Sequence, residues 1–476
     1  MPKQWKQFSG AWTPTQQLQA RGANTWPAVP GAPTIGTATA GNTEATVPFT
    51  APADTGYPTT LSYTVTSSPG SITATGTSSP ITVTGLTNDT AYTFTVTATN
   101  DTGTGPASAA SNSVTPVVTA RLYAWGLNQD KDLGFEDSVA RSSPTQLTSA
   151  TNWSVIDSAF EHTAAVKRDG TLWTWGSGQG GRGGRNSTTF ASSPTQVGAL
   201  TNWSFVSAGE GACAALKTDG TLWTWGGYFN GVLGTNDDIS RSSPVQVGAG
   251  TDWAVLIAGN ACLAVKTDGT LWSWGRYTGT GLGDGSGARS SPSQIGSDTD
   301  WATVGGAKQN DSAAFAIKTS GAAYVWGGGR KGQRGDNSWQ PEWKYTPAQL
   351  GALTNWENIE CNKETSFAIK TDGTLWSWGF DDSGVLGQNT NGQSRSSPVQ
   401  IGSLTTWDNV FPAYGNFAFA IKTDGTLWAW GNGDKGELGN NQSGTVRVSS
   451  PTQIGAITTW SYVGGGNEDA FAIENS

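Results

Sequence analysis

Few side chains in this 476-residue chain are of the types that do chemistry, and those few are not grouped. The chain has one histidine, His162, and it contains neither a Gly-x-Ser-x-Gly motif nor a His-Glu-x-x-His motif. A hydroxyl nucleophile with its base, or a zinc peptidase site, would need such a grouping. A polysaccharide lyase would need a base and a charge-neutralising group in one cleft, and the sequence identifies no such pair. We therefore expect no catalytic residues, no cofactor, no metal site and no enzymatic activity.

The remaining titratable groups favour structural roles. We interpret His162 as a hydrogen-bonded residue of the fold rather than a ligand or a base. The acid pairs Asp237-Asp238 and Asp381-Asp382 lie in loops rich in Asn and Gly. We expect these pairs to form solvated turns, and a cation site is the alternative.

The three cysteines are too few for a disulfide framework and lack metal-binding spacing. Cys213 and Cys262 occupy the same place in adjacent repeats, each seven residues before a turn glycine, and the third is Cys361. Two interpretations stay open for the first two: a bridge between repeats, or small buried side chains.

The elements that would position any site come from a repeat of about fifty residues. An aromatic residue, one further residue, Trp and Gly recur seven times, and the second aromatic residues are Trp125, Trp175, Trp225, Trp274, Trp326, Trp378 and Trp430. A second series is formed by Trp153, Trp203, Trp253, Trp301, Trp356, Trp407 and Trp460. A fixed period of this size marks an array of units, none of which can bury its apolar face alone.

Each unit has the length pattern of short strands joined by tight turns. The apolar runs are four to six residues long, which is typical of strands rather than helices. Asp-Gly separates two such runs in five units, as at Asp169-Gly170, and Ser320-Gly321 takes its place in the fifth unit. We expect type I′ hairpin turns there, with positive φ at both central residues.

Four strands in each of seven units predict an all-β fold with a seven-bladed β-propeller over residues 119–476. The chain stops at Ala470–Ser476, where a hairpin turn is due, and the missing partner strand stands at residues 121–126. We expect the two ends to complete one blade together and to leave no open sheet edge.

These units resemble the repeat of the regulator of chromosome condensation, abbreviated RCC1. The matching marks are the Asp-Gly-Thr-Leu-Trp-x-Trp-Gly stretch and the Gly-x-Leu-Gly that follows it, as at Gly231–Gly234. The resemblance implies the propeller and a role in binding. The family usually carries Gly-x-x-His before the hairpin strand, and here one unit keeps a histidine, His162. The inserted β-wedge with which the family's exchange factor acts on a small GTPase has no counterpart, so that activity is not expected here.

The segments before the propeller differ in composition. Residues 30–118 alternate with period two, as in Leu61–Val65 and Tyr92–Thr97, and predict an immunoglobulin-like sandwich. The stretch Gly85–Tyr92 resembles the corner of a fibronectin type III domain, which would make Tyr92 its corner tyrosine. We expect a spacer domain.

Residues 1–29 form a short N-terminal arm that is too small for a core. Two interpretations stay open: a tail packed on its own sandwich, or an anchor that docks into a larger assembly. The opening, from Gly10 to Pro27, resembles that of bacteriophage structural proteins. The candidate anchor residues are Trp5, Phe8, Trp12 and Trp26.

Charge and hydropathy exclude several classes of partner. The formal net charge is -9 and no basic run is present, which argues against nucleic acid. No apolar window is long enough to insert into a membrane, and the N-terminus lacks the apolar core of a secretory signal.

Comparison of the units with each other locates the candidate binding residues. The Asp-Gly hairpins and the crossings between units should share one face, and the loops that differ between units should share the other. Aromatic residues on these loops either pack on neighbouring blades or contact a glycan or protein ligand. The candidates are Arg330, Lys331, Arg334, Trp339, Trp343 and Tyr345 in the fifth unit, and Tyr228, Phe229, Tyr277 and Phe380 after three other Trp-Gly corners.

The sequence thus predicts a non-enzymatic bacteriophage virion protein of the tail, fibre or capsid surface. The arm would bind other virion proteins, and the propeller would attach to a host-surface glycan or protein by many weak contacts. We expect it on the virion surface, extracellular when acting. A bacterial cell-surface or secreted binding propeller is the alternative. The receptor and the oligomeric state, including a homo-oligomer, stay open.

Overall fold

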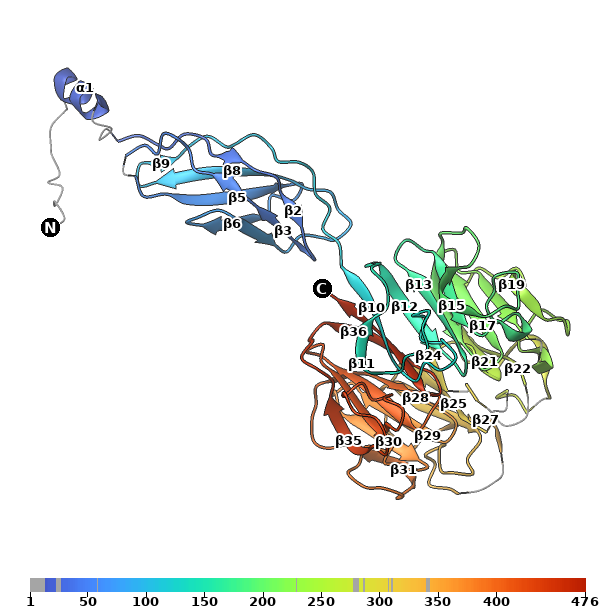
Figure 1. Cartoon of the computed structure of the whole chain (residues 1–476). Coiled ribbons are helices and arrows are strands. Elements are labelled where there is room, and N and C mark those ends of the chain that lie inside the picture. Colours follow the sequence, from blue (N-terminus) through green and yellow to red (C-terminus); the bar gives the residue numbers. More distant parts are fainter. Residues whose placement is uncertain are drawn as a thin grey trace. The chain divides into compact units, whose positions relative to one another are not determined.

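The structure is a computed structural model that describes residues 13–22, 27–57, 59–227, 229–276, 282–285, 287–306, 308–309, 311–339 and 343–476. The chain divides into two compact units, Met1–Thr119 with Ser476, and Ala120–Asn475. Among the described residues, the first unit contains the helix α1 (Pro14–Gly22), and apart from two short 3-10 helices the other regular elements of both units are strands (Figure 1). Thr13 caps this helix, since its Oγ1 accepts from Gln16 N at 3.3 Å while Gln16 Oε1 accepts from Thr13 N at 2.9 Å.

The rest of the first unit is a β-sandwich. Its strands form the sheets β2-β3-β7 and β6-β5-β8-β9 with the pair β1-β4. Alternate residues of β5 and β8 are buried, and Val65 and Val96 are completely inaccessible. Thr87 N donates to Tyr92 Oη at 3.1 Å, so Tyr92 ties its corner to the backbone upstream, as the resemblance implied. The strands are β1 (Thr34–Ile35), β2 (Thr39–Ala40), β3 (Glu44–Val47), β4 (Phe49–Thr50), β5 (Ser62–Ser68), β6 (Thr73–Gly76), β7 (Ile81–Thr84), β8 (Thr93–Asn100) and β9 (Gly103–Thr104).

The second unit is a β-propeller. Its described residues form seven antiparallel four-stranded sheets, the predicted blades. We number the blades by their Trp-Gly corners and call the strands of each blade first to fourth, from the axis outward. Blade 2 contains β12 (Trp153–Ser158), β13 (His162–Lys167), β14 (Leu172–Gly176) and β15 (Ala191–Gln196); blade 3 contains β16 (Trp203–Ala208), β17 (Ala212–Lys217), β18 (Leu222–Gly226) and β19 (Arg241–Gln246); blade 4 contains β20 (Trp253–Ile257), β21 (Ala261–Lys266), β22 (Leu271–Gly275) and β23 (Arg289–Gln294).

The remaining blades repeat this order. Blade 5 contains β24 (Trp301–Gly306), β25 (Ala313–Lys318), β26 (Ala323–Gly327) and β27 (Lys344–Gln349); blade 6 contains β28 (Trp356–Cys361), β29 (Thr365–Lys370), β30 (Leu375–Gly379) and β31 (Arg395–Gln400); blade 7 contains β32 (Trp407–Pro412), β33 (Phe417–Lys422), β34 (Leu427–Asn432) and β35 (Arg447–Gln453). Two short 3-10 helices, η1 (Gln179–Gly181) and η2 (Phe229–Gly231), follow the third strands of blades 2 and 3.

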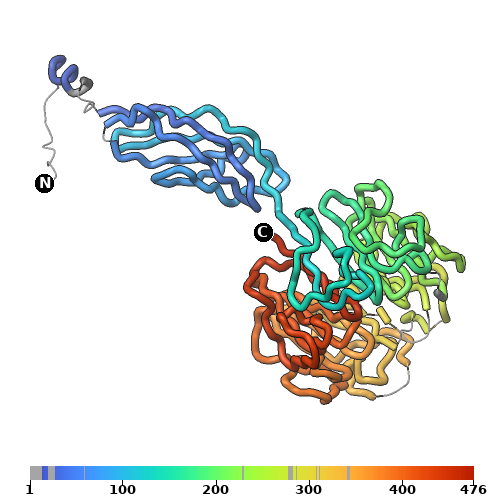
Figure 2. The backbone as a smooth tube through the Cα atoms, in the orientation of Figure 1, coloured from blue at the N-terminus to red at the C-terminus, as the bar shows by residue number. Residues whose placement is uncertain are grey.

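Blade 1 joins the two ends of the propeller chain. Its order is β36 (Trp460–Gly465), β37 (Asp469–Asn475), β10 (Ala120–Gly126) and β11 (Arg141–Gln146). β10 pairs with β37 in register from Ala120–Asn475 to Gly126–Asp469. Figure 2 shows the first propeller strand beside the end of the chain. The ring is therefore closed by hydrogen bonds between its own termini.

The corner tryptophans join each blade to the preceding one. All seven side chains of the Trp-Gly corners are completely buried. Trp225 Nε1 of blade 3 donates to Arg182 O of blade 2 at 2.9 Å, and Trp125 Nε1 of blade 1 donates to Glu437 O of blade 7 at 2.7 Å. The same bond recurs at Trp274, Trp378 and Trp430. The apolar ring and the indole N–H thus both serve the contact between blades.

The prediction of type I′ hairpin turns was wrong. In the Asp169-Gly170 turn of blade 2, only Gly170 has positive φ, at 74°, and Gly170 N donates to Lys167 O at 2.9 Å while Lys167 N donates to Thr171 O at 3.0 Å. The loop is therefore a tight turn followed by a glycine bulge. Asp169 keeps negative φ because its Oδ1 accepts from Thr171 N at 3.0 Å, a side-chain role that the dipeptide pattern did not reveal.

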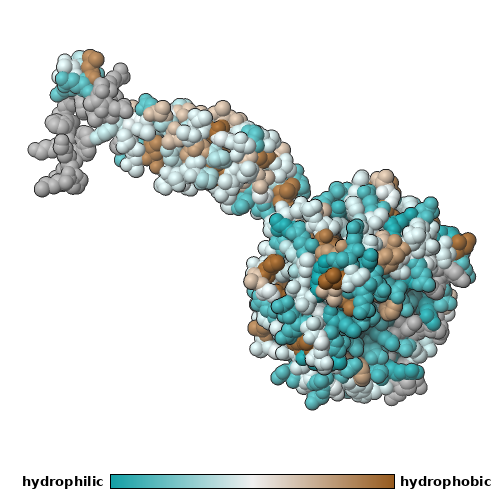
Figure 3. All heavy atoms as spheres, in the orientation of Figure 1, coloured by the Kyte–Doolittle hydropathy of each residue, from teal (hydrophilic) through white to brown (hydrophobic). Residues whose placement is uncertain are grey.

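The propeller surface is mostly polar, with small scattered apolar patches (Figure 3). Among the described residues, no helix is both long enough and apolar enough to span a bilayer.

Candidate functional site

The two faces of the propeller are built differently. One face carries the hairpins and the crossings between blades, and we call it the hairpin face. The other carries the loops after each first and third strand, and we call it the loop face. In the hairpins of blades 2, 3, 4, 6 and 7, an Asp, a Thr and a Trp repeat the same bonds, and the Trp Nε1 to Thr Oγ1 distance is 2.8 Å in four of them and 2.9 Å in blade 7. The loop face differs from blade to blade.

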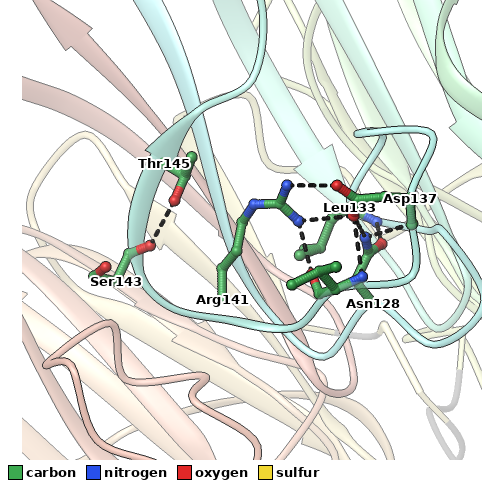
Figure 4. A network of polar contacts seen from close by, with 7 residues as sticks. Asn128, Leu133, Asp137, Arg141, Ser143 and Thr145 are labelled. Atoms are coloured by element: carbon green, nitrogen blue, oxygen red, sulfur yellow. Dashed lines mark hydrogen bonds and ion pairs between the residues drawn. The ribbon is translucent and has the colours of Figure 1, made fainter.

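Ion pairs brace the loops of the loop face. In the loop between β10 and β11, Asp137 binds Arg141 at 2.9 Å and accepts from Asn128 Nδ2, while Asn128 Oδ1 accepts from Leu133 N (Figure 4). The hydrogen bond from Arg141 lowers the pKa of Asp137 to about 2. The loops are therefore held in shape before any partner arrives, which reduces the entropy cost of binding.

One acid of each predicted pair belongs to this bracing, whereas Asp238 and Asp382 are exposed, as expected of solvated turns. Asp237 binds Arg241 and accepts from Thr235 Oγ1 at 2.9 Å. Asp381 is 2% exposed and accepts from Gln393 N at 3.0 Å. Across the described part of the chain, no three His, Cys, Asp or Glu side chains are grouped so as to hold a metal ion.

The loop of blade 5 presents part of the predicted binding set. Trp339 is 49% exposed and Tyr345 is 40% exposed, and Arg330 is exposed as well. Trp339 lies on the turn at Gly332, where an added Cβ would come within 3.1 Å of the ring. Trp343 is half-buried.

Lys331 and Phe380 join blade 5 to blade 6. Lys331 Nζ lies 4.0 Å from the centroid of the Phe380 ring, and both side chains are half-buried. Phe380 therefore packs on a residue of the neighbouring blade, which is the first of the two alternatives set out from the sequence.

Arg334 was wrongly predicted to offer its charge to a ligand. Its side chain is 2% exposed, and Nε lies 3.0 Å from Asp336 Oδ2 while NH2 donates to Ser338 Oγ at 3.0 Å. The guanidinium fork is used to build the loop, because an unpaired charge could not be buried there. Sequence spacing alone does not show which of three neighbouring cations turns inward.

Several predicted residues lie outside the described residues. These are Trp5, Phe8, Trp12 and Trp26 of the arm and Tyr228 and Tyr277 of the loop face, and the side chain of Phe229 is likewise not described.

The cysteines are free and buried, so no bridge joins the blades. Cys213 Sγ lies 3.2 Å from His162 Nε2. Burial lowers the pKa of His162 to about 3, and burial raises the pKa of the Cys213 thiol, so both groups are neutral at pH 7. The pair therefore has a structural role.

An axial cavity, which the sequence analysis missed, is lined by the first strands of all seven blades. Its volume is about 450 Å³, and its lining includes Phe205, Thr303, Phe411 and Tyr462. Consecutive residues of the first strands, such as Thr303 and Val304, line it, so no alternation in the sequence marked the cavity.

Charged groups from distant blades meet in this cavity. Lys308, from the loop between β24 and β25, binds Asp157 of β12 with Nζ–Oδ1 at 3.0 Å. Asp157 also accepts from Ala208 N at 2.9 Å, and Tyr414 Oη donates to Lys308 O at 3.0 Å. Burial raises the pKa of Glu360 to about 7, although Lys308 opposes the rise. The sequence analysis found no grouped acid and base, and the fold creates this group across the axis.

The comparisons agree with the geometry of both units. The fibronectin type III domain family matches residues 31–114, and the regulator of chromosome condensation (RCC1) repeat matches residues 169–216, 372–410 and 424–473. The chain carries RCC1 repeats behind a fibronectin type III domain. Two solved structures share the propeller fold. Human WBSCR16 has a TM-score of 0.64 and 17% identity, and the match covers 75% of this chain and 98% of that chain. Prp20p from Saccharomyces cerevisiae has a TM-score of 0.64 and 18% identity, and the match covers 75% of this chain and 92% of that chain.

Relatives of known sequence match over the repeats. The probable E3 ubiquitin-protein ligase HERC6 of Homo sapiens is 28% identical over 148 residues, which is 30% of this chain and 14% of the ligase. The mitochondrial RCC1 domain-containing protein RUG3 of Arabidopsis thaliana is 30% identical over 151 residues, which is 30% of this chain and 33% of RUG3. The matched stretch is therefore a third or less of each relative.

Proposed function

We propose that this chain is a non-enzymatic binding protein that contacts a partner protein through the loop face of blade 5. The observation that carries the proposal is that Arg330 and Trp339, in the loop after β26, and Tyr345, at the start of β27, are all exposed in the blade whose Lys331 contacts Phe380. Trp, Tyr and Arg are the residues that most often dominate the binding energy of protein interfaces. The cations beside the rings favour a partner surface with acidic groups.

The related propellers support a protein partner. The structure of Prp20p was described together with its binding to Gsp1p and histones. That propeller shares the fold of this one, and by analogy we assign a binding role to this propeller without assigning those partners.

A more specific proposal than the binding role is that the chain lies on the surface of a bacteriophage virion and is extracellular when it acts. Its support is the resemblance of residues 10–27 to the opening of phage structural proteins, and within that stretch α1 is a capped helix. The arm would bind other virion proteins, and the propeller would bind the host surface, with a surface glycan as the alternative ligand. A bacterial cell-surface or secreted propeller would use the same loop face.

The test measures binding of the fluorescently labelled chain to intact host cells. We expect the double variant Trp339→Ala with Tyr345→Ala to lose about 2–4 kcal/mol, a drop of more than about tenfold in affinity. The matched control is Leu353→Ala with Leu404→Ala, because these side chains are both 46% exposed on the hairpin face. Equal binding by the two double variants would refute the blade 5 site. Mass spectrometry of purified virions tests the virion-surface proposal. Absence of the chain from the particles would refute it.

A further inference from the structure

The axial cavity is reached from the hairpin face. The first strand of every blade starts at that face, and its second residue is exposed in all seven blades, whereas its fifth residue is exposed in none. At the loop-face end, Lys308 of blade 5 crosses the axis to Asp157 of blade 2, and Lys308 O accepts from Tyr414 Oη of blade 7. A solute would therefore enter from the hairpin face, away from the loops of blade 5.

The carboxyl groups that line the cavity without a cationic partner lie on blades 6 and 7. Glu357 and Asp408 are the exposed second residues of β28 and β32, and the other five blades have Ser or Ala at this position. Glu360 lines the cavity three residues further along β28. Among the described residues these three form no ion pair, whereas Asp157 is paired with Lys308. The fold thus leaves a surplus of negative charge in the cavity.

Glu360 is the innermost of these three acids. It is half-buried, and Gly306 N donates to its Oε2 over a long 3.5 Å. Burial raises the pKa of Glu360 to about 7, so this carboxyl group is only partly ionised at pH 7. A cation beside it would favour the ionised form.

Much of the remaining lining is apolar or aromatic. Phe205 of blade 3 and Val255 and Ile257 of blade 4 line the cavity on one side. Phe411 and Tyr462 line it from blades 7 and 1, with their ring centroids 5.2 Å apart. Such surface can cover methylene groups, and the face of an aromatic ring attracts a cation. The volume of about 450 Å³ lies within the range of small-molecule sites.

We propose that the axial cavity binds a linear aliphatic polyamine, with one ammonium group at Glu357 and Asp408 and another beside Glu360. From the second to the fifth residue of β28 the strand rises about 10 Å, at about 3.3 Å per residue. A chain with amines at intervals can reach both depths, and its methylene groups would lie on the apolar lining. A compact metal ion would need its ligands together, and within the described ranges no three such groups are.

The test is isothermal titration calorimetry of the full chain with spermidine in about 0.15 M NaCl, where charges more than about 8 Å apart are largely screened. We expect one spermidine to bind per chain. Glu357→Gln with Asp408→Asn should weaken the affinity about tenfold or more, and so should Glu360→Gln, because each change removes a charged acceptor. The matched control is Asp238→Asn with Asp382→Asn, which removes the same charge from exposed positions on the loop face.

Three results would overturn the proposal. The first is that spermidine shows no saturable binding. The second is equal weakening by the two double variants, which would mean attraction to the acidic chain as a whole. The third is that octanediol, a neutral chain, or N-acetyl-lysine amide, which carries the single ammonium group of a protein lysine, binds as tightly as spermidine.

Further measurements separate this site from folding defects and from the blade 5 site. Thermal unfolding followed by Trp fluorescence checks that each variant is folded. The variant Trp339→Ala with Tyr345→Ala should bind spermidine as the wild type does, because the cavity is entered from the opposite face. Failure of the proposed protein contact and failure of the polyamine site are therefore distinguishable.

Discussion

Asp469→Asn should stabilise the propeller at neutral pH and leave it unchanged in acid. Asp469 begins β37, the strand that closes the ring against β10, and it is 5% exposed. Its Oδ1 has no hydrogen-bond donor among the described residues, and the same holds for Asp132 Oδ1 in the loop after β10. Two carboxyl groups, each with one oxygen that lacks a donor, thus lie at the seam between the first and last strands.

Both groups hold their protons more tightly in the folded state. Burial, and after it the charge of Asp132, raises the pKa of Asp469 well above its usual range. Burial raises the pKa of Asp132 to about 6, and the charges of Asp130 and Glu468 add to the rise. The two groups titrate as a coupled pair.

The sign of the effect follows from linkage. A carboxyl group with a raised pKa in the folded state gives stability that is complete below its unfolded pKa, near 4, and that is lost as the pH rises towards the folded pKa. Within that window, each such group lowers the free energy of unfolding by about 1.4 kcal/mol per pH unit. Between pH 5 and pH 7, Asp469 therefore removes at most about 3 kcal/mol, which is the limit for one proton over two pH units. The side chain of an asparagine at 469 does not titrate, so it does not lower the free energy of unfolding of the variant as the pH rises.

The assay is thermal unfolding of the full chain at pH 5 and pH 7, followed by Trp fluorescence. For a unit of this size, about 3 kcal/mol corresponds to a shift of about 4 °C in Tm. We expect the difference in Tm between Asp469→Asn and wild type to grow from pH 5 to pH 7, by up to that amount. Asp238→Asn, which changes an exposed carboxylate, is the control and should show no such growth. A constant difference at both pH values would refute the reasoning.

Three further outcomes test the packing. Lys308→Met should destabilise the propeller by about 3–5 kcal/mol in urea unfolding, because Asp157 keeps a buried unpaired charge, and adding Asp157→Asn should restore most of the loss. Trp225→Phe should cost about 2 kcal/mol, because Arg182 O loses its buried donor; an equal cost for Trp272→Phe, whose ring is half-buried, would contradict this. Maleimide should label the buried Cys213 far more slowly in the folded chain than in urea, and rapid labelling measured by mass spectrometry would contradict its burial.

Much of the fold was readable because its signals are local and repeated. The Trp-Gly corners fixed the number of units, and strand-length apolar runs fixed the class of element. Tyr92 marked the corner of the sandwich because its hydrogen bond spans five residues. The turn type was missed at Asp169, since the side-chain bonds that hold this residue at negative φ compete with the preference of the dipeptide.

Less of the candidate site could be predicted from the sequence, because residues that are neighbours in sequence take opposite roles. Lys331 stacks on a ring of the next blade, whereas Arg334, three residues later, is buried against Asp336. The exposure of Trp339 and Tyr345 likewise depends on what blade 6 covers.

The sequence by itself determined the repeat, the strand-rich class and the order of the two domains, because periodicity and turn chemistry act within a few residues. Only the tertiary structure decided which distant side chains meet: Lys308 with Asp157 across the axis, and Asp469 with Asp132 at the seam. The repeat predicted which strands close the ring, but which side chains of different blades come into contact depends on the curvature of the whole ring, which no local pattern records.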